Sequence, residues 1–239
     1  MRPEENLKTL AANPYTGRGI SVGLDETGTR ALQVYWITGR SANSRNRIFV
    51  ADGATLRTAA ADPSKVQDPR LIIYNAMREL PKVFIVSNGD QTDTIYDAIS
   101  SGGSFSKGLE SRTYEPDPPS NTARISAISD LRSGRLLAEI SVVKKSPYAD
   151  AAQRQTFQYE ALPRGAGFTV TTYAGDGNPL PRFEGEPYLL PLAGPPRRVA
   201  ETIWNALDAA NRVCLVVKTI DIATGRSSME IVNAYKAVG

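Results

Sequence analysis

The sequence predicts an α+β fold, in which strands dominate and the few helices are grouped rather than alternating with strands. Most apolar segments of the 239-residue chain alternate with polar residues at a period of two, which is typical of half-buried strands. This pattern indicates sheets that pack on each other with helices outside them. Because no repeat, low-complexity tract or convincing linker divides the chain, we expect residues 1–239 to form a single domain.

Alternation predicts strands at the following segments, of which the first two form a hairpin: 18–24, 30–37, 47–52, 82–87, 123–130, 135–145, 154–162, 167–174, 212–221 and 227–236. Helical spacing of apolar residues predicts a helix over 69–80, which contains Ile72, Ile73, Ala76, Met77 and Leu80. Further helices are expected at 92–101 and 196–210, and long loops at 102–121 and 175–188.

The composition excludes several classes of protein. A hydrophobic content of 41% is ample for a core, but no segment approaches the roughly 18 apolar residues of a membrane span. The first residues lack the apolar core of a signal peptide, so we expect a cytoplasmic protein. Cys214 is the only cysteine, which excludes an internal disulfide and fits a reducing compartment; it is most simply an apolar residue of a buried strand.

The chain contains no histidine, and this limits the chemistry that it can perform. Histidine is the usual general base and the usual metal ligand, so every Ser–His or Cys–His arrangement is excluded. One cysteine and carboxylates do not suit zinc, which prefers nitrogen and sulfur ligands. We therefore expect no metal and no cofactor. Any catalysis must use carboxylates, Tyr, Lys, Arg, hydroxyls or the backbone.

The mild net charge of +3 gives little support to a nucleic-acid binder, because no basic run is long and no aromatic residues are interleaved with the basic ones. A compact anion such as a phosphate fits as well. In "GRSANSRNR", the guanidinium groups of Arg40, Arg45 and Arg47 converge with Ser41 on a turn that suits an oxyanion or phosphate. A solvated turn explains the same segment equally well.

Three other segments carry candidate site residues. "VSNGDQTDT" (86–94) links a strand to a helix and is either ordinary turn and N-cap chemistry or a ligand site. Tyr74, next to Asn75, is a core tyrosine by its spacing, with its hydroxyl at the edge of the core. Glu115, in the long loop, is either an acid or base brought to a pocket or an exposed carboxylate.

The order of five motifs carries more information than any one of them. "YTGRGISVG", "GRSANSRNR", "YNAMR", "VSNGDQTDTI" and "TYEPD…NTARISA" follow one another within residues 15–127. In this order and at similar intervals they strongly resemble the archaeal-type IMP cyclohydrolases. That family has a Y-x-G-R start, an S-R-S…N-R turn, an A-Y-N-x-x-R helix, V-S-N-G-x-x-T-D-T-I and a Y-E…T-P-R-I-A segment. A Thr-Tyr pair at 172–173 and the closing strands extend the resemblance more weakly.

The resemblance implies a fold and a reaction. The fold would be a four-layer α/β/β/α sandwich similar to that of the N-terminal nucleophile hydrolases, without self-processing. The start Met1-Arg2-Pro3, which offers no nucleophile, fits this expectation. The reaction would be the closure of 5-formamidoimidazole-4-carboxamide ribotide to inosine monophosphate with loss of water, the last step of de novo purine synthesis. The partners implied are this purine ribotide and further copies of the chain in a homo-oligomer, with no nucleic acid and no membrane.

The resemblance also implies roles for individual residues. Arg47, Tyr74 and Glu115 match the family's catalytic positions: Glu115 would transfer the proton, while Tyr74 and Arg47 would donate to the developing oxyanion or orient the carboxamide. The roles of Glu115 and Tyr74 can be exchanged. The substrate-binding residues implied are Arg18 and Arg40 as phosphate partners, with Ser41, Asn75, Ser87, Asn88, Thr92, Asp93 and Arg124.

The sequence departs from the family pattern at Gln91, where the family has His, and at Ala123, where it has Pro. The segments 57–68 and 175–188 are also longer than expected. Two rival functions therefore stay open. One is a related amide-cleaving or cyclising enzyme that acts on another ribotide. The other is a non-catalytic purine nucleotide-binding protein, against which the three matched catalytic residues argue.

Overall fold

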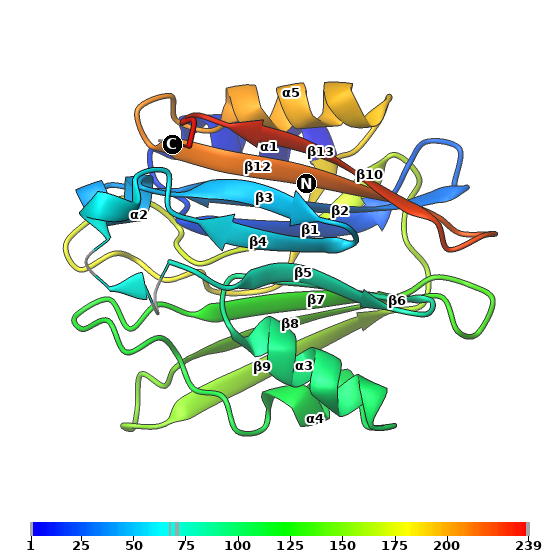
Figure 1. The fold of residues 1–239 in the computed structure, drawn as a ribbon, viewed down its shortest axis with the longest axis horizontal. Coiled ribbons are helices and arrows are strands. Elements are labelled where there is room, and N and C mark those ends of the chain that lie inside the picture. Colours follow the sequence, from blue (N-terminus) through cyan, green and yellow to red (C-terminus); the bar gives the residue numbers. More distant parts are fainter. Residues whose placement is uncertain (1, 67, 70–71, 238–239) are drawn as a thin grey trace.

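The structure is a computed structural model that describes residues 2–66, 68–69 and 72–237 (Figure 1). Its strands form two sheets, and all strands that are neighbours in a sheet run antiparallel. In order across the first sheet the strands are β11 (Tyr188–Pro191), β10 (Ala166–Thr171), β1 (Arg18–Leu24), β2 (Arg30–Thr38), β12 (Arg212–Asp221) and β13 (Ser227–Asn233). Across the second sheet they are β3 (Ile48–Asp52), β4 (Thr55–Ala59), β5 (Asn75–Leu80), β6 (Val83–Ser87), β7 (Arg124–Asp130), β8 (Leu137–Lys145) and β9 (Ala152–Tyr159).

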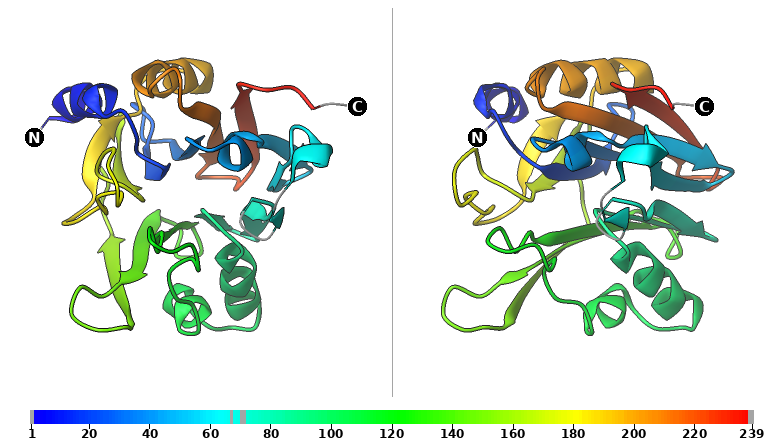
Figure 2. Two further views of the ribbon diagram at one scale, coloured as in Figure 1. Left: turned by 90° about the vertical axis from the view of Figure 1, so that its left-hand side faces the viewer. Right: turned by 60° about the vertical axis from the view of Figure 1, so that its left-hand side comes forward.

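The two sheets face each other, and helices cover their outer faces (Figures 1 and 2). Two helices, α1 (Pro3–Ala12) and α5 (Pro196–Ala206), lie on the first sheet, and two others, α3 (Gln91–Ser100) and α4 (Phe105–Leu109), lie on the second. The short helix α2 (Ala42–Arg45) and a 3₁₀ turn at Pro63–Lys65 belong to connections. Among the described residues, no helix is long and apolar enough to cross a membrane.

The core lies between the sheets because alternate residues of each strand point to the same face. On β1, Ile20 and Val22 point toward the second sheet, whereas Ser21 points away from it and accepts a hydrogen bond from Thr169 of β10. The inter-sheet core combines residues from widely separated parts of the chain, from Ile20 to Val216. Removing this apolar surface from water is the main stabilising contribution to the fold.

The helix α5 shows why helices form on the outside. Its Val199 and Ile203 recur on one face and are buried against β2 and β12 of the first sheet, while its other face is polar. The expected helices at 92–101 and 196–210 are thereby confirmed as α3 and α5. The expected strands are also confirmed, each with its ends shifted by a few residues at most.

The helix expected over 69–80 is wrong in its described part, because residues 75–80 form the strand β5; residues 70 and 71 lie outside the described residues. β5 pairs with β6 through Met77 opposite Val86, and α3 covers the outer face of β5. A strand that is covered on both faces has apolar residues in consecutive positions, and its pattern cannot be distinguished from that of a helix by spacing. The sequence analysis also missed the strands β4 and β11 and the helices α1, α2 and α4, of which α4 lies within the loop expected at 102–121.

Candidate active site

The ends of several strands bring candidate residues together at one end of the sandwich. Because neighbouring strands are antiparallel, β1, β3, β5 and β7 begin where β2, β6 and β10 end. This end faces the viewer in the left panel of Figure 2. Residues at strand starts and strand ends can therefore meet there, although they are distant in sequence.

Two tyrosine hydroxyls meet between the sheets at this end. Tyr35 Oη of β2 and Tyr74 Oη, which lies just before β5, are 2.6 Å apart. Tyr35 is fully buried and Tyr74 is 7% exposed. The backbone of Tyr74 is fixed by Thr58, since Tyr74 N–H donates to Thr58 Oγ1 at 2.9 Å and Thr58 N–H donates to the Tyr74 carbonyl at 2.9 Å.

Arg47, a buried guanidinium, acts electrostatically on both phenols. It stands immediately before β3 and is 2% exposed, and its Nε–H donates to the Ser44 carbonyl at 2.8 Å. Burial raises the pKa of Tyr74 above its ordinary value, although Arg47 and Arg18 favour the phenolate. Burial and Tyr74 also raise the pKa of Tyr35. Both phenols are therefore neutral near pH 7 and are suited to donate hydrogen bonds.

An ion pair joins the two sheets beside the tyrosines. Arg18 Nη2, at the first residue of β1, lies 2.6 Å from Glu115 Oε1, in the loop before β7. Burial raises the pKa of Glu115 above its ordinary value, and Arg18 only partly offsets this effect. The Arg18 Nε–H is buried and has no hydrogen-bond partner among the residues that the structure describes. Arg18 also acts electrostatically on Tyr74, Tyr35 and Tyr173.

The loop that carries Glu115 is held by a short chain of hydrogen bonds. Glu115 N–H donates to the Thr122 carbonyl at 2.8 Å, and Thr122 Oγ1 contacts both Asp117 and the hydroxyl of Tyr173. The Tyr173 ring stacks on Tyr15 at a centroid distance of 5.7 Å. These contacts connect the loop before β7 in the second sheet to the segment after β10 in the first.

The sequence of this chain matches a known protein family over a range that includes the buried cluster. The model of a family described as IMP cyclohydrolase-like protein matches residues 15–225, which include all four residues Arg18, Arg47, Tyr74 and Glu115. The chain belongs to the IMP cyclohydrolase-like family.

Individual relatives in the IMP cyclohydrolase-like family match a smaller part of the chain. The IMP cyclohydrolase of Methanopyrus kandleri is 35% identical over 119 residues, which cover 48% of this chain and 59% of the relative. The IMP cyclohydrolase of Methanothrix thermoacetophila is 32% identical over 126 residues, which cover 51% of this chain and 61% of the relative. That of Methanocella arvoryzae is 29% identical over 135 residues, covering 55% of this chain and 63% of the relative. The chain thus aligns with about three fifths of each of these relatives.

In the strand-to-helix turn at residues 86–94, the polar side chains form hydrogen bonds to other groups of the protein. Asn88 Nδ2–H donates to the Ala123 carbonyl at 2.9 Å, and Asn88 Oδ1 accepts from Ile125 N–H at 2.9 Å and from Gln91 Nε2–H at 2.8 Å. Ser87 and Thr92, both fully buried, hydrogen-bond to each other and to the Gly89 carbonyl. The side chains of this turn therefore fix α3 against the start of β7.

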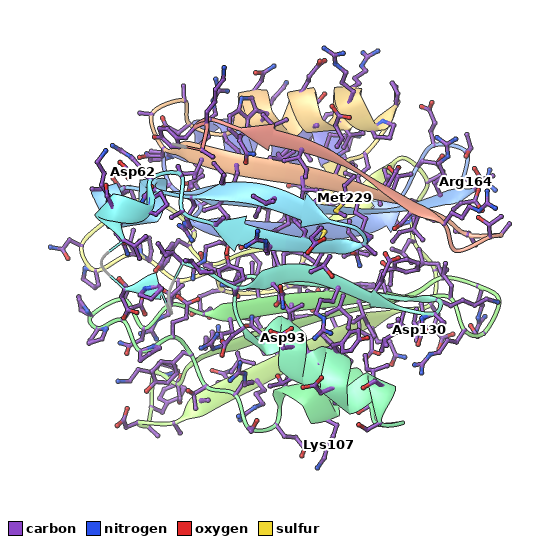
Figure 3. The ribbon with its side chains drawn as sticks, viewed as in Figure 1. Asp62, Asp93, Lys107, Asp130, Arg164 and Met229 are labelled. Atoms are coloured by element: carbon purple, nitrogen blue, oxygen red, sulfur yellow. The ribbon has the colours of Figure 1, made fainter. Side chains whose placement is uncertain are left out.

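Asp93 and Asn75 lie together on the helix-covered side of the second sheet. Asp93 lies beside α3 (Figure 3), where Asn75 Nδ2–H and Arg78 Nη1–H donate to its Oδ1 at 3.0 and 2.8 Å. Arg78 also packs on the ring of Tyr96. Arg124 Nη1–H donates to Asp90 Oδ1 and to Gln91 Oε1, both at 2.8 Å. These candidates surround α3, and their hydrogen bonds among the described residues do not reach Tyr35 or Tyr74.

The basic turn at residues 39–47 has an exposed part and a buried part. Ser41 is the N-cap of α2 and accepts a hydrogen bond from Ser44 N–H at 3.1 Å. Arg40, which is 40% exposed at its side chain, forms an ion pair with Asp176 of the second long loop and lies over the ring of Tyr15 at 4.9 Å. Arg40 and Ser41 are thus at the surface of the site, whereas Arg47 is inside it.

The structure adds Tyr35 and Tyr173 to the residues expected from the sequence. Tyr35 was interpreted only as part of an alternating strand, although its place two residues before the inward-facing Ile37 puts it on the same face of β2. Tyr173 was included only in a weak Thr-Tyr match. Tyr35 and Tyr173 both lie within a few residues of a strand end, at the end of the sandwich where the other candidate residues gather. This position is the feature by which both tyrosines could have been identified.

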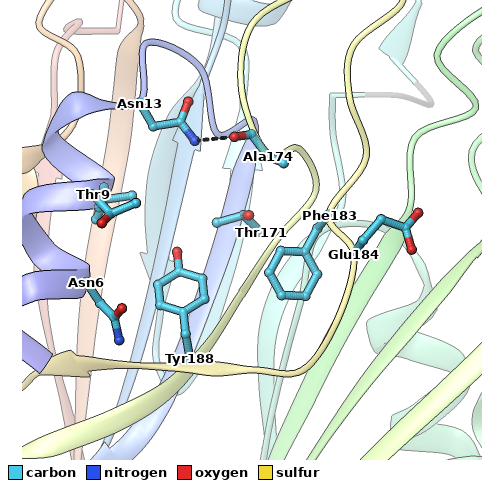
Figure 4. A pocket seen from close by; sticks show the side chains of 9 residues that line it. Asn6, Thr9, Asn13, Thr171, Ala174, Phe183, Glu184 and Tyr188 are labelled. Atoms are coloured by element: carbon cyan, nitrogen blue, oxygen red, sulfur yellow. Dashed lines mark hydrogen bonds between the residues drawn. The ribbon is translucent and has the colours of Figure 1, made fainter. Parts of the chain in front are cut away.

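A pocket of about 280 Å³ lies on the outer side of the first sheet and is lined by none of the residues of the buried cluster (Figure 4). It is bounded by α1, β11 and the segment after β10, and its lining residues are Asn6, Thr9, Leu10, Asn13, Thr171, Ala174, Phe183, Glu184 and Tyr188. Asn13 Nδ2–H closes one side by donating to the Ala174 carbonyl at 2.9 Å. Among the described residues, no group of three or more His, Cys, Asp or Glu side chains could hold a metal ion.

Proposed function

We propose that this chain is an IMP cyclohydrolase, which closes 5-formamidoimidazole-4-carboxamide ribotide to inosine monophosphate with loss of water. The names of three relatives support this activity, and so does the motif order in the sequence. The observation that carries the proposal is the buried cluster itself. A carboxylate paired with Arg18 and a phenol on which Arg47 acts electrostatically converge at one end of the sandwich, where both sheets contribute residues.

The reaction is difficult because an amide nitrogen is a poor nucleophile. When the carboxamide nitrogen attacks the formyl carbon, a C–N bond forms, the nitrogen loses a proton and the formyl oxygen becomes an oxyanion. That oxygen takes up two protons, one from the carboxamide nitrogen and one from the N–H of the former formamide, and leaves as water when the C–O bond breaks and a C=N bond to the former formamide nitrogen forms. Both reacting groups belong to one substrate, so holding the correct rotamer supplies much of the rate. The protein must add a proton acceptor and donors for the oxyanion.

We assign the proton acceptor to Glu115 and the donor to Tyr74. Burial raises the pKa of the Glu115 carboxyl, and a raised pKa makes its carboxylate a stronger base than a free one. Burial likewise raises the pKa of Tyr74, so this phenol keeps its proton at neutral pH and donates it as a hydrogen bond. Arg47 supplies positive charge beside Tyr74. Glu115 returns its proton to the oxygen that leaves as water.

We propose that Arg18 acts through Glu115 rather than directly on a phosphate, because its guanidinium is buried against that carboxylate. Arg40 and Ser41, at the surface of the site, are the better candidates for the phosphate of the ribotide. The remaining predicted binding residues contribute by shaping the wall of the site through α3 and its turn: Asn75, Ser87, Asn88, Thr92, Asp93 and Arg124.

Further proposals concern the whole molecule. The order helix, sheet, sheet, helix and the antiparallel pairing support a kinship with the sandwich fold of the N-terminal nucleophile hydrolases. The inter-sheet core, which draws on both halves of the chain, supports a single domain. We also propose a cytoplasmic homo-oligomer that works without a cofactor, on the grounds of the family resemblance.

The experiment is an assay of inosine monophosphate formation from the formamido ribotide. Tyr74→Phe and Glu115→Gln are compared with Tyr188→Phe and Glu139→Gln, which alter a tyrosine of the outer pocket and a half-buried glutamate of β8. We expect turnover to fall by about 10²–10³-fold in Tyr74→Phe and by about 10²–10⁴-fold in Glu115→Gln, with little change in the controls. No turnover by the wild type, together with saturable binding of inosine monophosphate, would instead favour another ribotide as substrate or a non-catalytic role.

A further inference from the structure

We propose that Tyr35 is a positioning residue, whose hydroxyl donates to Tyr74 Oη and thereby directs the proton of Tyr74 toward the substrate. This inference rests on the proposed function, because it assigns a task to the site of that reaction. It concerns the direction of one hydrogen bond, which the 2.6 Å separation of the two oxygens leaves open.

The burial of Tyr35 limits where its proton can go. Tyr35 is fully buried, and Tyr74 Oη is the hydrogen-bond partner recorded for its hydroxyl in the described part of the chain. A phenol O–H is a good donor, and a buried donor without an acceptor is costly. Tyr35 therefore satisfies its proton by donating to Tyr74. The opposite direction would leave the proton of the fully buried Tyr35 without an acceptor, whereas the proton of Tyr74, which is 7% exposed, can be donated to a bound substrate.

Tyr74 is then left with a free proton in a defined place. Its backbone N–H and carbonyl are both hydrogen-bonded to Thr58, and its ring is buried. Because Tyr35 donates to its oxygen, the O–H of Tyr74 is free to donate to the substrate. A donor whose direction is fixed before the oxyanion forms stabilises that charge without reorganisation. Tyr35 thereby acts on the reaction through Tyr74, without touching the substrate.

The first test is a double-mutant cycle on turnover. Tyr35→Phe, Tyr74→Phe and the double variant are compared, with Tyr188→Phe as a matched control that leaves the site intact. We expect Tyr35→Phe to lower kcat about tenfold with KM within about twofold, and the double variant to equal Tyr74→Phe alone. If the two losses multiply in the double variant, Tyr35 acts independently of Tyr74, and the proposal is overturned.

The second test does not depend on the identity of the substrate. Tyr74 is replaced by 3,5-difluorotyrosine, whose lower phenol pKa allows titration of the folded protein by fluorine NMR. Adding Tyr35→Phe removes a donor to the Tyr74 oxygen, so the midpoint of this titration is expected to rise by about one pH unit. An unchanged midpoint overturns the proposal. If the wild type does not convert the formamido ribotide but the midpoint rises, the proposed reaction fails while the assignment of the hydrogen bond holds.

Discussion

The guanidinium of Arg18 and the carboxylate of Glu115 form a buried ion pair, 2.6 Å between Nη2 and Oε1, that spans the two sheets. Arg18 begins β1 of the first sheet and Glu115 lies in the loop before β7 of the second, so the pair connects the first sheet to that loop. The side chains are 12% and 7% exposed, so water screens the pair only weakly. The same interaction therefore bears on stability and on the state of the proposed base.

Replacing Arg18 by methionine should destabilise the protein strongly. The change leaves the buried Glu115 without its counter-charge, and breaking a buried pair in this way typically costs about 3–5 kcal/mol. Urea denaturation followed by circular dichroism measures the loss. Arg40→Met serves as the control, because its ion pair with Asp176 is exposed and such pairs contribute at most about 1 kcal/mol. Equal losses in the two variants would contradict the structural role given to Arg18.

The pH dependence of turnover should report Glu115. The base must be ionised, so kcat/KM falls as the pH drops through its pKa, which burial raises above the ordinary value of a glutamate. Because Arg18 offsets part of that rise, the conservative variant Arg18→Gln should move this acidic limb to still higher pH. The measurement is a pH profile of kcat/KM for both proteins. A limb that stays in place in the variant would exclude Glu115 as the group that titrates.

Asn88→Ala should affect stability more than substrate binding. The Asn88 side chain forms two hydrogen bonds to the start of β7 and one to Gln91 of α3, and unpaired buried groups left behind cost about 1–3 kcal/mol. We expect the thermal midpoint to fall while KM of the remaining folded enzyme changes little. A large rise in KM at unchanged stability would instead indicate that Asn88 contacts the ligand directly.

Variants of Arg40 and of its ion-pair partner Asp176 test whether Arg40 binds the phosphate of the ribotide. If Arg40 binds the phosphate of the ribotide, Arg40→Ala should raise KM about tenfold, as expected for the loss of a charged hydrogen bond of about 1.5 kcal/mol. Asp176→Asn removes the residue that competes for Arg40 and should leave KM equal or lower. Steady-state kinetics separates these outcomes. The opposite order, with the larger effect at Asp176, would move the phosphate away from Arg40.

Much of the fold follows from the sequence because apolar residues alternate with polar or small ones in many strands. In β9 the exposure of the side chains alternates, in β1 Ser21 separates Ile20 from Val22 although both faces are buried, and α5 is amphipathic. β5 does not alternate in this way, because α3 covers its outer face and the inter-sheet core covers the other. Spacing alone then carries no information that separates a strand from a helix.

The candidate site was predictable only in part, for a different physical reason. Arg47, Tyr74 and Glu115 were found through motif order, which says nothing of distance in space. The approach of Glu115 to Arg18 depends on the packing of two sheets, and no local pattern in the chain encodes it. Tyr35 was missed because an inward-facing tyrosine in an alternating strand has the same signature as a core residue, and only the position of its hydroxyl against Tyr74 distinguishes it.

Strand ends and connections from both sheets build this cluster, so it is complete only after the two sheets have docked. Neither sheet holds a complete set of the proposed groups: Arg18 and Tyr35 belong to the first sheet, whereas Arg47, Tyr74 and Glu115 belong to the second sheet and its connections. A molecule in which each sheet has formed but the two have not yet docked would have native secondary structure and no catalytic power. Recovery of turnover during refolding would therefore time the docking of the two sheets, separately from the earlier appearance of the strands.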